Sequence, residues 1–343
     1  MRSPHFLVIG CVAALAWSGT AFIQEPEESA TLTFRPVAEW NTLLPNEKWQ
    51  GIHGMIPIEH DGEEGFLVVS EEYSLAVDTD GNGKCDKEVK GQGDFLTLSG
   101  RDAAGEKLQY AVRIRAGSNG WEYACSGVAR GKVRGVEVSI VDQNNNGRWN
   151  DVGEDAMFLG KAAAACFLSQ VVNLDGELYE MEVSADGRRA VTRPYDGPRA
   201  TLNLAGSFDA EGELITAVMR SSDERFSFEF AGQKNGLAVP TGSYVLEHAF
   251  GRKGAETVRG RAGRMQAVFL EEGENHLLQW GAPVSLEFTY AASSADEITV
   301  QIPTFYGAAG EEWYEFQPDA KSPKIYVLDE KGKELWSGQF GGC

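Results

Sequence analysis

The sequence predicts a mostly β protein built from short strands and tight turns. Glycine is abundant, with 40 residues among 343, whereas proline is modest at 12. Apolar and polar residues alternate in several separate segments, which is the pattern of a strand with one buried face. Asp-Gly, Glu-Gly and Lys-Gly pairs, which favour turns, separate these segments. Hydrophobic residues make up 42% of the chain, which is enough to form cores.

The alternation places the clearest strands in the sequence. They are expected at 108–115, 136–140, 179–183, 226–230 and 284–290. Asp175-Gly176 separates two apolar runs and predicts a two-residue hairpin. One helix is expected, over Asp155–Leu168, because an alanine run occupies 162–165.

The N-terminus has the features of a secretory signal peptide. Arg2 is followed by an apolar stretch over 6–17, and Gly19 and Ala21 are small residues suited to cleavage after position 21. No later segment is long enough to span a bilayer. We therefore expect residues 1–21 to be removed, and the mature protein to be secreted, periplasmic or at the cell surface, with no transmembrane segment.

The formal net charge of -20 limits the classes of partner. A chain this acidic repels phosphate backbones, so nucleic acid is not expected as a partner. An extracellular protein or a polysaccharide at the cell surface remains open, and the sequence does not indicate the oligomeric state. The surplus of carboxylates also supplies hard oxygen ligands for divalent cations.

The cysteines leave two alternatives open. Removal of the signal peptide takes Cys11 and leaves Cys85, Cys125, Cys166 and Cys343. An even number in an exported protein allows two disulfides, in any of three pairings. Free buried thiols are the alternative, because the domains are large enough to fold without disulfides.

Composition divides the mature chain into segments. Residues 22–30 are acidic and are expected to form a flexible leader. A β domain is expected over 31–196, ending at a turn-rich break. Residues 197–343 have the length and strand spacing of one or two β-sandwich modules, with a division near residue 272 if there are two.

A short motif in the C-terminal half gives a fold resemblance. The segment Val239–Leu246 contains the pattern Pro240-x-Gly242-x-Tyr244. It resembles a strand entry found in transthyretin-like and other immunoglobulin-like accessory domains. The resemblance covers eight residues and implies an immunoglobulin-like sandwich for the module that contains it.

Two Asp/Asn/Gly loops form an internal repeat. The first covers 78–86 and the second 142–151, and they align without a gap, each after an apolar strand. The matched pairs are Asp78 with Asp142, Asp80 with Asn144, Asn82 with Asn146, Gly83 with Gly147, and Lys84 with Arg148.

This pattern fits the coordination chemistry of calcium. Calcium takes six to eight oxygen ligands, and a tight loop offers them from the side chains at positions one, three and five and from the backbone carbonyl at position seven. A glycine at position six permits the sharp turn. Both loops resemble the EF-hand-like loops of dockerin modules and thrombospondin-type repeats, which implies calcium as the ligand. The candidate ligands are Asp78, Asp80, Asn82, Lys84 and Asp86 in the first loop, and Asp142, Asn144, Asn146, Arg148 and Asp151 in the second.

The loops depart from an EF-hand in two respects. Position twelve, normally a bidentate glutamate, holds Val89 in the first loop and Gly153 in the second. The flanking segments have strand patterns, so we expect the loops on β-hairpins. The second loop has fewer carboxylates and should bind calcium more weakly. The alternative is that both are metal-free turns, because Asn, Asp and Gly favour turns by themselves.

The sequence gives little support for an enzyme. No zinc motif of the H-E-x-x-H type and no G-x-S-x-G elbow is present. We expect a structural or adhesive, non-catalytic role, with the chain mostly β: a β domain carrying two metal-loop hairpins, then the sandwich modules. A carbohydrate-binding or enzyme-accessory module is the first alternative, with Trp313 and Tyr314 as the best exposed platform. A hydrolase with an unrecognised site is the second.

Overall fold

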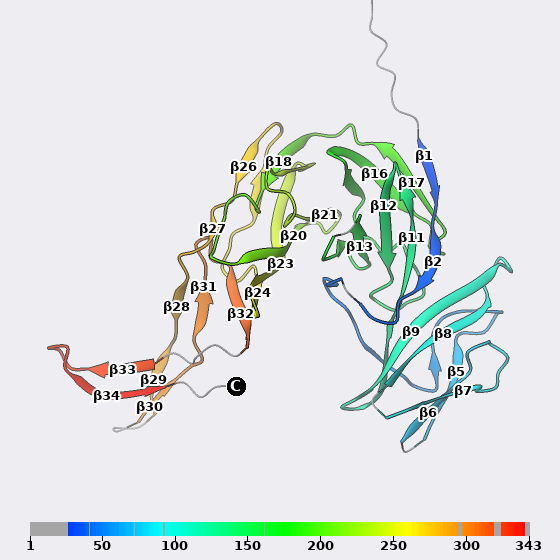
Figure 1. Ribbon diagram of the computed structural model, residues 1–343, viewed down its shortest axis with the longest axis horizontal. Coiled ribbons are helices and arrows are strands. Elements are labelled where there is room, and N and C mark those ends of the chain that lie inside the picture. The colour runs from blue at the N-terminus through cyan, green and yellow to red at the C-terminus, as the bar shows by residue number, and fades with distance from the viewer. Residues whose placement is uncertain are drawn as a thin grey trace, which may run out of the picture.

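The mostly β prediction is confirmed by the computed structural model, in which strands are the regular secondary structure. The structure describes residues 27–40, 42–71, 73–91, 93–160, 162–293, 297–318 and 324–339. No α-helix occurs within these ranges, and therefore none that could cross a bilayer. Figure 1 shows two lobes joined as an arch, with a narrow C-terminal arm extending from the second lobe. The expected signal peptide lies outside the described residues.

The first lobe contains four sheets formed by β1 to β17. Every strand pair within these sheets is antiparallel. The sheets are β1(Glu28–Thr31)-β17(Arg189–Pro194)-β16(Glu177–Val183)-β15(Val171–Leu174); β3(Gln50–Gly51)-β10(Gly120–Cys125)-β9(Lys107–Gly117)-β8(Gly93–Arg101); β14(Cys166–Phe167)-β13(Ala156–Leu159)-β12(Val136–Val141)-β11(Gly127–Val133)-β2(Thr33–Pro36); and β4(Met55–Ile56)-β5(Phe66–Ser70)-β6(Ser74–Val77)-β7(Lys87–Lys90).

The second lobe is organised around one large antiparallel sheet. Its order is β21(Ser227–Glu229)-β20(Glu213–Ser221)-β23(Gly242–Lys253)-β24(Glu256–Arg261)-β32(Glu312–Gln317)-β31(Thr304–Tyr306)-β28(Ser285–Glu287), and β25(Val268–Leu270) also pairs with β23. Two smaller sheets, each with a parallel pair, are β22(Leu237–Pro240)-β18(Arg199–Asn203)-β26(Asn275–Leu277) and β19(Phe208–Asp209)-β27(Trp280–Gly281). The arm in Figure 1 comprises the end of the large sheet, β31 and β28, and beyond it the hairpins β29(Tyr290–Ala292)-β30(Ile298–Val300) and β33(Lys324–Leu328)-β34(Glu334–Gln339).

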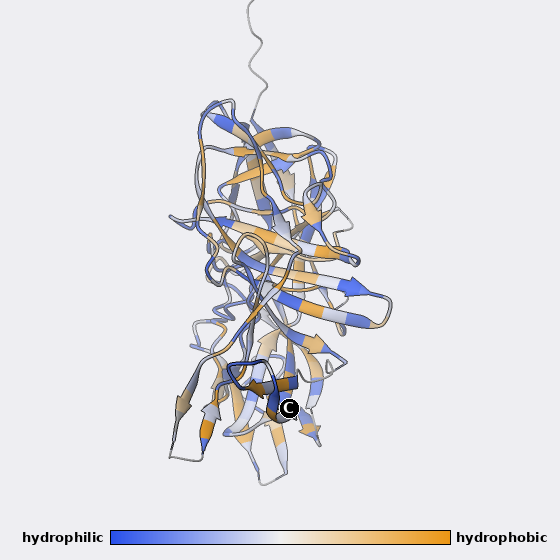
Figure 2. Ribbon diagram, turned by 90° about the vertical axis from the view of Figure 1, so that its left-hand side faces the viewer, coloured by the Kyte–Doolittle hydropathy of each residue, from blue (hydrophilic) through white to orange (hydrophobic). Residues whose placement is uncertain are grey.

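Each lobe has its own hydrophobic core. Tyr110 and Tyr123 are fully buried in the first core, and Trp280 and Tyr244 in the second. Figure 2 shows apolar and polar residues alternating along many of the strands, as expected for sheets with one buried face. The lobes are joined by direct bonds, among them one from the Arg220 guanidinium to the carbonyl of Gly153 at 2.7 Å. The division at residue 196 stays a prediction.

One predicted turn agrees with the structure, and a second turn lies at the short Pro240-x-Gly242-x-Tyr244 motif. Asp175 and Gly176 join β15 to β16 with φ angles of 53° and 97°, which is the left-handed backbone of a two-residue hairpin turn. Pro240 ends β22, and the hydroxyl of Tyr244 in β23 donates to its carbonyl at 2.9 Å. The short motif is therefore a strand-to-strand turn closed by its own tyrosine, and the wider family resemblance stays a prediction.

The helix predicted over Asp155–Leu168 is wrong. The segment contains strands β13 and β14, which pair with each other and continue the sheet from β12. Ala156, Ala164 and Ala165 are buried there, so packing against neighbouring strands overrides the helical preference of alanine.

The flexible leader predicted over 22–30 is also wrong in its last three residues. Glu28–Thr31 forms β1, which pairs with β17 along four registered positions. Ala30 is buried in the first core, so this strand has an apolar anchor as well as backbone bonds. The preceding part of the expected leader, 22–26, lies outside the described residues.

The cysteines are free thiols where the structure describes them. Cys125 and Cys166 are buried, and Cys85 is half-buried. The alternative with two disulfides would need at least one bond among these three, so it is wrong. Cys343 lies outside the described residues.

The arm exposes many apolar side chains. The alternating residues Val284, Leu286, Phe288 and Tyr290 are all exposed, by 40% to 71%. The single half-buried strand predicted over 284–290 is therefore wrong, because the segment is divided between β28 and β29 and its apolar face is not covered by the described residues.

Candidate metal centre

Both Asp/Asn/Gly loops connect adjacent antiparallel strands, as predicted. The first joins β6 to β7, and Val77 pairs with Lys87 at its base. The second joins β12 to β13, and Val141 pairs with Ala156. The loops are therefore β-hairpin loops of 78–86 and 142–155, without the flanking helices of an EF-hand.

The two loops have the same backbone at matched positions. Gly83 and Gly147, at position six, both have φ of 79°. Gly81 and Asn145, at position four, have φ of 70° and 64°. Left-handed φ is open to glycine and tolerated by asparagine, so the sequence repeat encodes a repeated conformation.

The same hydrogen bonds recur in both loops. Three bonds repeat. The backbone amide at position six donates to Oδ2 of the aspartate at position one, at 2.7 Å in each loop. The backbone amide at position seven donates to the side-chain oxygen at position five, and the amide at position five donates to the side-chain oxygen at position three. In the first loop they are Gly83 to Asp78, Lys84 to Asn82 at 2.9 Å and Asn82 to Asp80 at 3.3 Å; in the second, Gly147 to Asp142, Arg148 to Asn146 at 2.8 Å and Asn146 to Asn144 at 3.2 Å. The oxygens at positions one, three and five are thus oriented by backbone amides in both loops.

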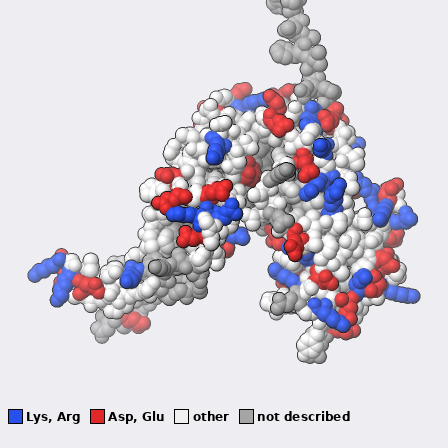
Figure 3. All heavy atoms as spheres, viewed as in Figure 1, with Lys and Arg blue, Asp and Glu red and all other residues white. Residues whose placement is uncertain are grey.

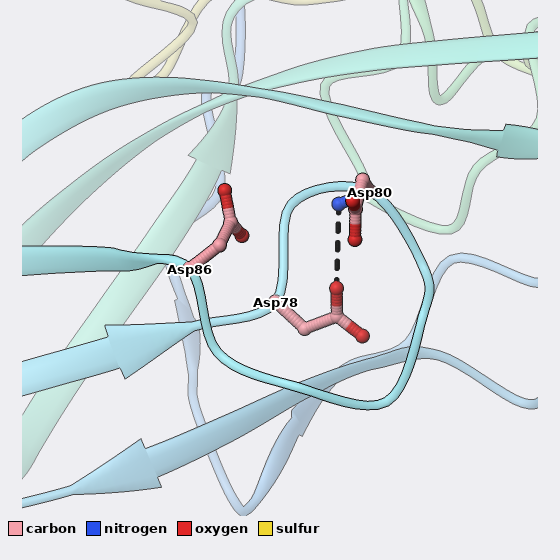
Figure 4. Close-up of side chains that lie close together, drawn as sticks. All are labelled: Asp78, Asp80 and Asp86. Atoms are coloured by element: carbon pink, nitrogen blue, oxygen red, sulfur yellow. Dashed lines mark hydrogen bonds between the residues drawn. The ribbon is translucent and has the colours of Figure 1, made fainter.

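In the first loop, the three aspartates form an acidic cluster that could hold a metal ion. One carboxylate oxygen each of Asp78, Asp80 and Asp86 lies within 4.8 Å of the others. Figure 4 shows Asp78 and Asp80 on the turn of the loop, joined by a hydrogen bond from the Asp80 backbone amide, and Asp86 just before β7. Asp78 is buried and the other two are exposed. Three carboxylates this close repel one another unless a cation lies between them.

Thr79 positions Asp86. Its amide donates to Oδ1 of Asp86 at 2.7 Å, and its hydroxyl donates to Oδ2 at 2.9 Å. Burial would raise the pKa of Asp86, but the hydrogen bonds from Thr79 outweigh it and lower that pKa. Asp86 is therefore ionised at neutral pH and available as a ligand.

The second loop brings its predicted side chains together through Asp151. The side-chain amides of Asn144 and Asn146 both donate to Oδ2 of Asp151, at 3.1 Å and 2.5 Å. Asp142 is fully buried and accepts from the hydroxyl of Tyr110 at 2.8 Å. Burial raises the pKa of Asp142 to about 6. The asparagines donate to Asp151 here, which an aspartate at the same positions could not do when ionised.

Asp155 is a further carboxylate at the second loop that the predicted ligand set does not include. It is fully buried; one oxygen accepts from the amide of Asp151 at 2.9 Å, and the other has no partner among the described residues. Burial, followed by the charge of Asp142, raises its pKa to about 9. Asp155 is the last residue before β13, at the position where the wrong helix prediction placed a helix start.

The two loops pack against one short segment. A side chain at Gly81 would meet the ring of His60 at 2.6 Å, and one at Gly147 would meet Ile58 at 3.3 Å. His60 is buried and stacks on Phe66 with ring centroids 3.7 Å apart. Segment 58–60 therefore connects the first loop to the second, and His60 serves packing there.

The side chains of Lys84 and Arg148 are exposed, so at position seven only the backbone could serve a metal.

Trp313, predicted as part of an exposed aromatic platform, is buried to 95% and stacks on Trp280 with ring centroids 6.0 Å apart. Its Nε1 donates to Glu311 at 3.2 Å. The platform prediction is therefore wrong for Trp313, whose alternating strand points it into the second core.

The fold and the first loop together define a β-rich protein with an acidic cluster suited to a metal ion. Comparison with protein-family models, with curated proteins and with solved structures finds no match to this chain.

Proposed function

We propose that this chain is an exported protein that binds calcium in the loops 78–86 and 142–155 and has a structural or adhesive, non-catalytic role. The observation that carries the proposal is the acidic cluster of Asp78, Asp80 and Asp86, held on a loop whose first, third, fifth and sixth positions follow the calcium-loop pattern. The repeated backbone of the second loop supports it.

The chemistry of the first loop favours calcium over other metals. Calcium–oxygen distances are about 2.3–2.6 Å, so two ligand oxygens lie at most about 5 Å apart, which the separation within 4.8 Å satisfies. Zinc would draw on nitrogen or sulfur. Cys85 lies beside Asp86, but its thiol is directed to the carbonyl of Leu67 at 3.9 Å. Magnesium prefers fewer protein ligands and retained water.

The position of the loops supports a structural role for the ion. Asp78 follows β6, and Asp86 precedes β7, so one ion bound by both would fix the ends of two strands. An ion in the second loop would likewise link the ends of β12 and β13 around the buried Asp142. A ligand that binds only the native state stabilises it by about 2.7 kcal/mol at a hundredfold excess over Kd.

Thermal melting tests the proposal. We expect calcium at millimolar concentration to raise the melting temperature of the EDTA-treated protein, and Asp78→Ala to remove most of the increase. Asp142→Ala should remove a smaller part. Glu272→Ala, which changes an exposed carboxylate in another turn, is the matched control and should keep the full increase. Identical melting of the unmodified chain in EDTA and in calcium would contradict the proposal.

A further inference from the structure

The arm carries a long hairpin with one apolar and one polar face. Residues 284–306 run outwards through β28 and β29 and return through β30 and β31 in antiparallel register. The amide of Gln301 donates to the carbonyl of Thr289 at 2.9 Å, so the pairing continues between the two strand pairs. In a strand, every second side chain lies on the same face. One face therefore carries the alternating apolar residues, and the other carries Ser285, Glu287, Thr289, Thr299 and Gln301.

The apolar face of this hairpin is exposed. The apolar strip, as we call it, consists of six side chains with exposed fractions of 40% to 78%: Val284, Leu286, Phe288, Tyr290, Ile298 and Ile302. A large aromatic side chain covers about 150–250 Å², so the exposed part of the strip amounts to roughly 600 Å². The largest apolar patch on a typical monomer is about 300–600 Å² and often marks an interaction site.

The apolar strip continues the buried face of the large sheet. Leu286 pairs with Phe305, and Phe305 pairs with Trp313, so the three side chains form one row across β28, β31 and β32. Trp313 is buried in the second core, and Phe305 packs against that core. Leu286, at the end of the row, is exposed. The strip therefore extends a core-facing surface past the described residues that cover it. A two-stranded hairpin is marginally stable by itself, so this face gains most from a cover.

The distribution of charge limits what can cover the strip. None of its six residues is charged, whereas the chain has a formal net charge of -20. An anionic membrane would repel so acidic a chain. Figure 3 shows acidic and basic side chains over both lobes, and the arm projects away from these lobes in Figure 1. Two arms can therefore meet without bringing the lobes of two acidic chains into contact.

A second copy of the chain supplies a matching cover. An identical strip offers the same apolar surface, and a two-fold contact buries both strips at once. Two such hairpins packed face to face, about 10 Å apart, have the geometry of a small β-sandwich. A standard interface buries about 800 Å² on each partner, which the strip and its polar rim approach in size.

We propose that the arm is the dimerisation element of this protein, in which the hairpins 284–306 of two copies pack strip to strip about a two-fold axis. The polar face of each hairpin then remains in water, and the apolar faces form a shared core. The metal loops lie in the first lobe, so this proposal does not depend on calcium.

Sedimentation equilibrium of the purified chain in EDTA tests the proposal, because EDTA removes any cation that could bridge acidic chains. We expect twice the mass of one chain at micromolar concentration. Ile302→Asp places a charge in the strip and, through its copy, a like charge across the interface, so it should weaken dimerisation at least about a hundredfold. Gln301→Asp is the matched control, because it adds the same charge to the neighbouring residue on the polar face, and it should leave the dimer intact.

Salt provides a second readout that does not depend on how a variant folds. Sodium chloride screens the repulsion between two acidic chains, so it should strengthen a dimer held by apolar surface. A dimer of the unmodified chain that dissociates as salt rises would overturn the proposal, because ion pairs would then hold it. So would a chain that is monomeric throughout the micromolar range, or that binds phosphatidylcholine vesicles through the strip instead. A dimer that Ile302→Asp and Gln301→Asp affect equally would also overturn it.

Discussion

The backbone amide of Gly83 donates to Oδ2 of Asp78 at 2.7 Å, from the sixth position of the first loop back to its first. Gly147 and Asp142 make the same bond at the same distance in the second loop. The bond closes each loop into a ring and fixes the first aspartate before any ion is bound. Such preorganisation lowers the entropy cost of ordering the loop when an ion binds.

Glycine substitutions should separate backbone strain from steric clash. Gly83→Ala forces alanine to φ of 79° with open space around its Cβ, so we expect a loss of about 1–2 kcal/mol. Gly81→Ala adds a clash with the ring of His60 at 2.6 Å and should cost more. Gly232→Ala, at an exposed position in open space without positive φ, is the control. Urea unfolding measures all three, and equal losses for Gly81→Ala and Gly83→Ala would exclude the packing of His60 described above.

Adding a carboxylate to the second loop should have opposite effects with and without calcium. Asn144→Asp gives this loop the charge that Asp80 gives the first, and it replaces an amide that donates to Asp151 by a like charge. In EDTA we expect a lower melting temperature from repulsion, and in calcium a tenfold or so tighter affinity, about 1.4 kcal/mol. Calcium titration with a fluorescent competitor measures the affinity. A variant that binds no more tightly than the unmodified chain would remove the second loop from the proposal.

Asp155 should destabilise the metal-free protein. Its carboxylate is fully buried with one unpaired oxygen, and its pKa is raised to about 9, so the folded state resists its ionisation at neutral pH. Because the folded pKa lies above the unfolded value, stability falls as pH rises from about 4 towards 9.

Asp155→Asn keeps the acceptor for the Asp151 amide and removes the ionisable group. We expect this substitution to raise the melting temperature in EDTA at about pH 8. The increase should be smaller in calcium, because a bound calcium ion would offset the charge of Asp155 in the unmodified chain. Asp209→Asn, at an exposed position, is the control. A lower melting temperature of Asp155→Asn in EDTA would show that Asp155 is satisfied without a metal.

His248 should make stability depend on acidity. Its pKa is lowered from 6.5 to about 4, so below about pH 6.5 the unfolded chain binds a proton that the folded chain does not. Stability should therefore fall as the pH drops from about 6.5 to about 4, by up to about 3 kcal/mol at about 1.4 kcal/mol per pKa unit. Above about pH 6.5 this histidine should contribute no pH dependence.

His248→Leu isolates this contribution. The neighbouring charges of Arg113, Glu47, Glu247 and Arg259 are the same in both proteins, so the difference between their unfolding curves reports His248 alone. We expect that difference to grow on going from about pH 7.5 to about pH 4.5. A constant difference across this interval would mean that water reaches the ring and that its pKa is near the ordinary value.

The sequence predicted the features that depend on local patterns. The strands at 108–115 and 136–140, the turn at Asp175-Gly176 and the hairpin setting of both loops depend on alternation and on residues that accept left-handed φ. The acidic cluster was predictable because Asp78, Asp80 and Asp86 lie in one loop of nine residues. Local residue order alone brings them together.

The features that sequence did not predict depend on packing between distant segments. The alanine run at 162–165 is a loop, in which Ala164 bridges Leu43 and Ala165 is buried in the first core. Trp313 is buried because Trp280, 33 positions earlier, stacks on it. Trp40, Arg113 and His248 line one cavity only through the contact of the two lobes. No spacing in the sequence encodes that meeting.

Calorimetric titration of calcium into the demetallated chain tests the central claim most directly. The loops predict uptake of two ions per chain, with the tighter site abolished in Asp78→Ala and the weaker in Asp142→Ala. A titration that releases no heat, together with elemental analysis that finds no calcium retained by the chain, would contradict the claim that these hairpin loops are calcium sites.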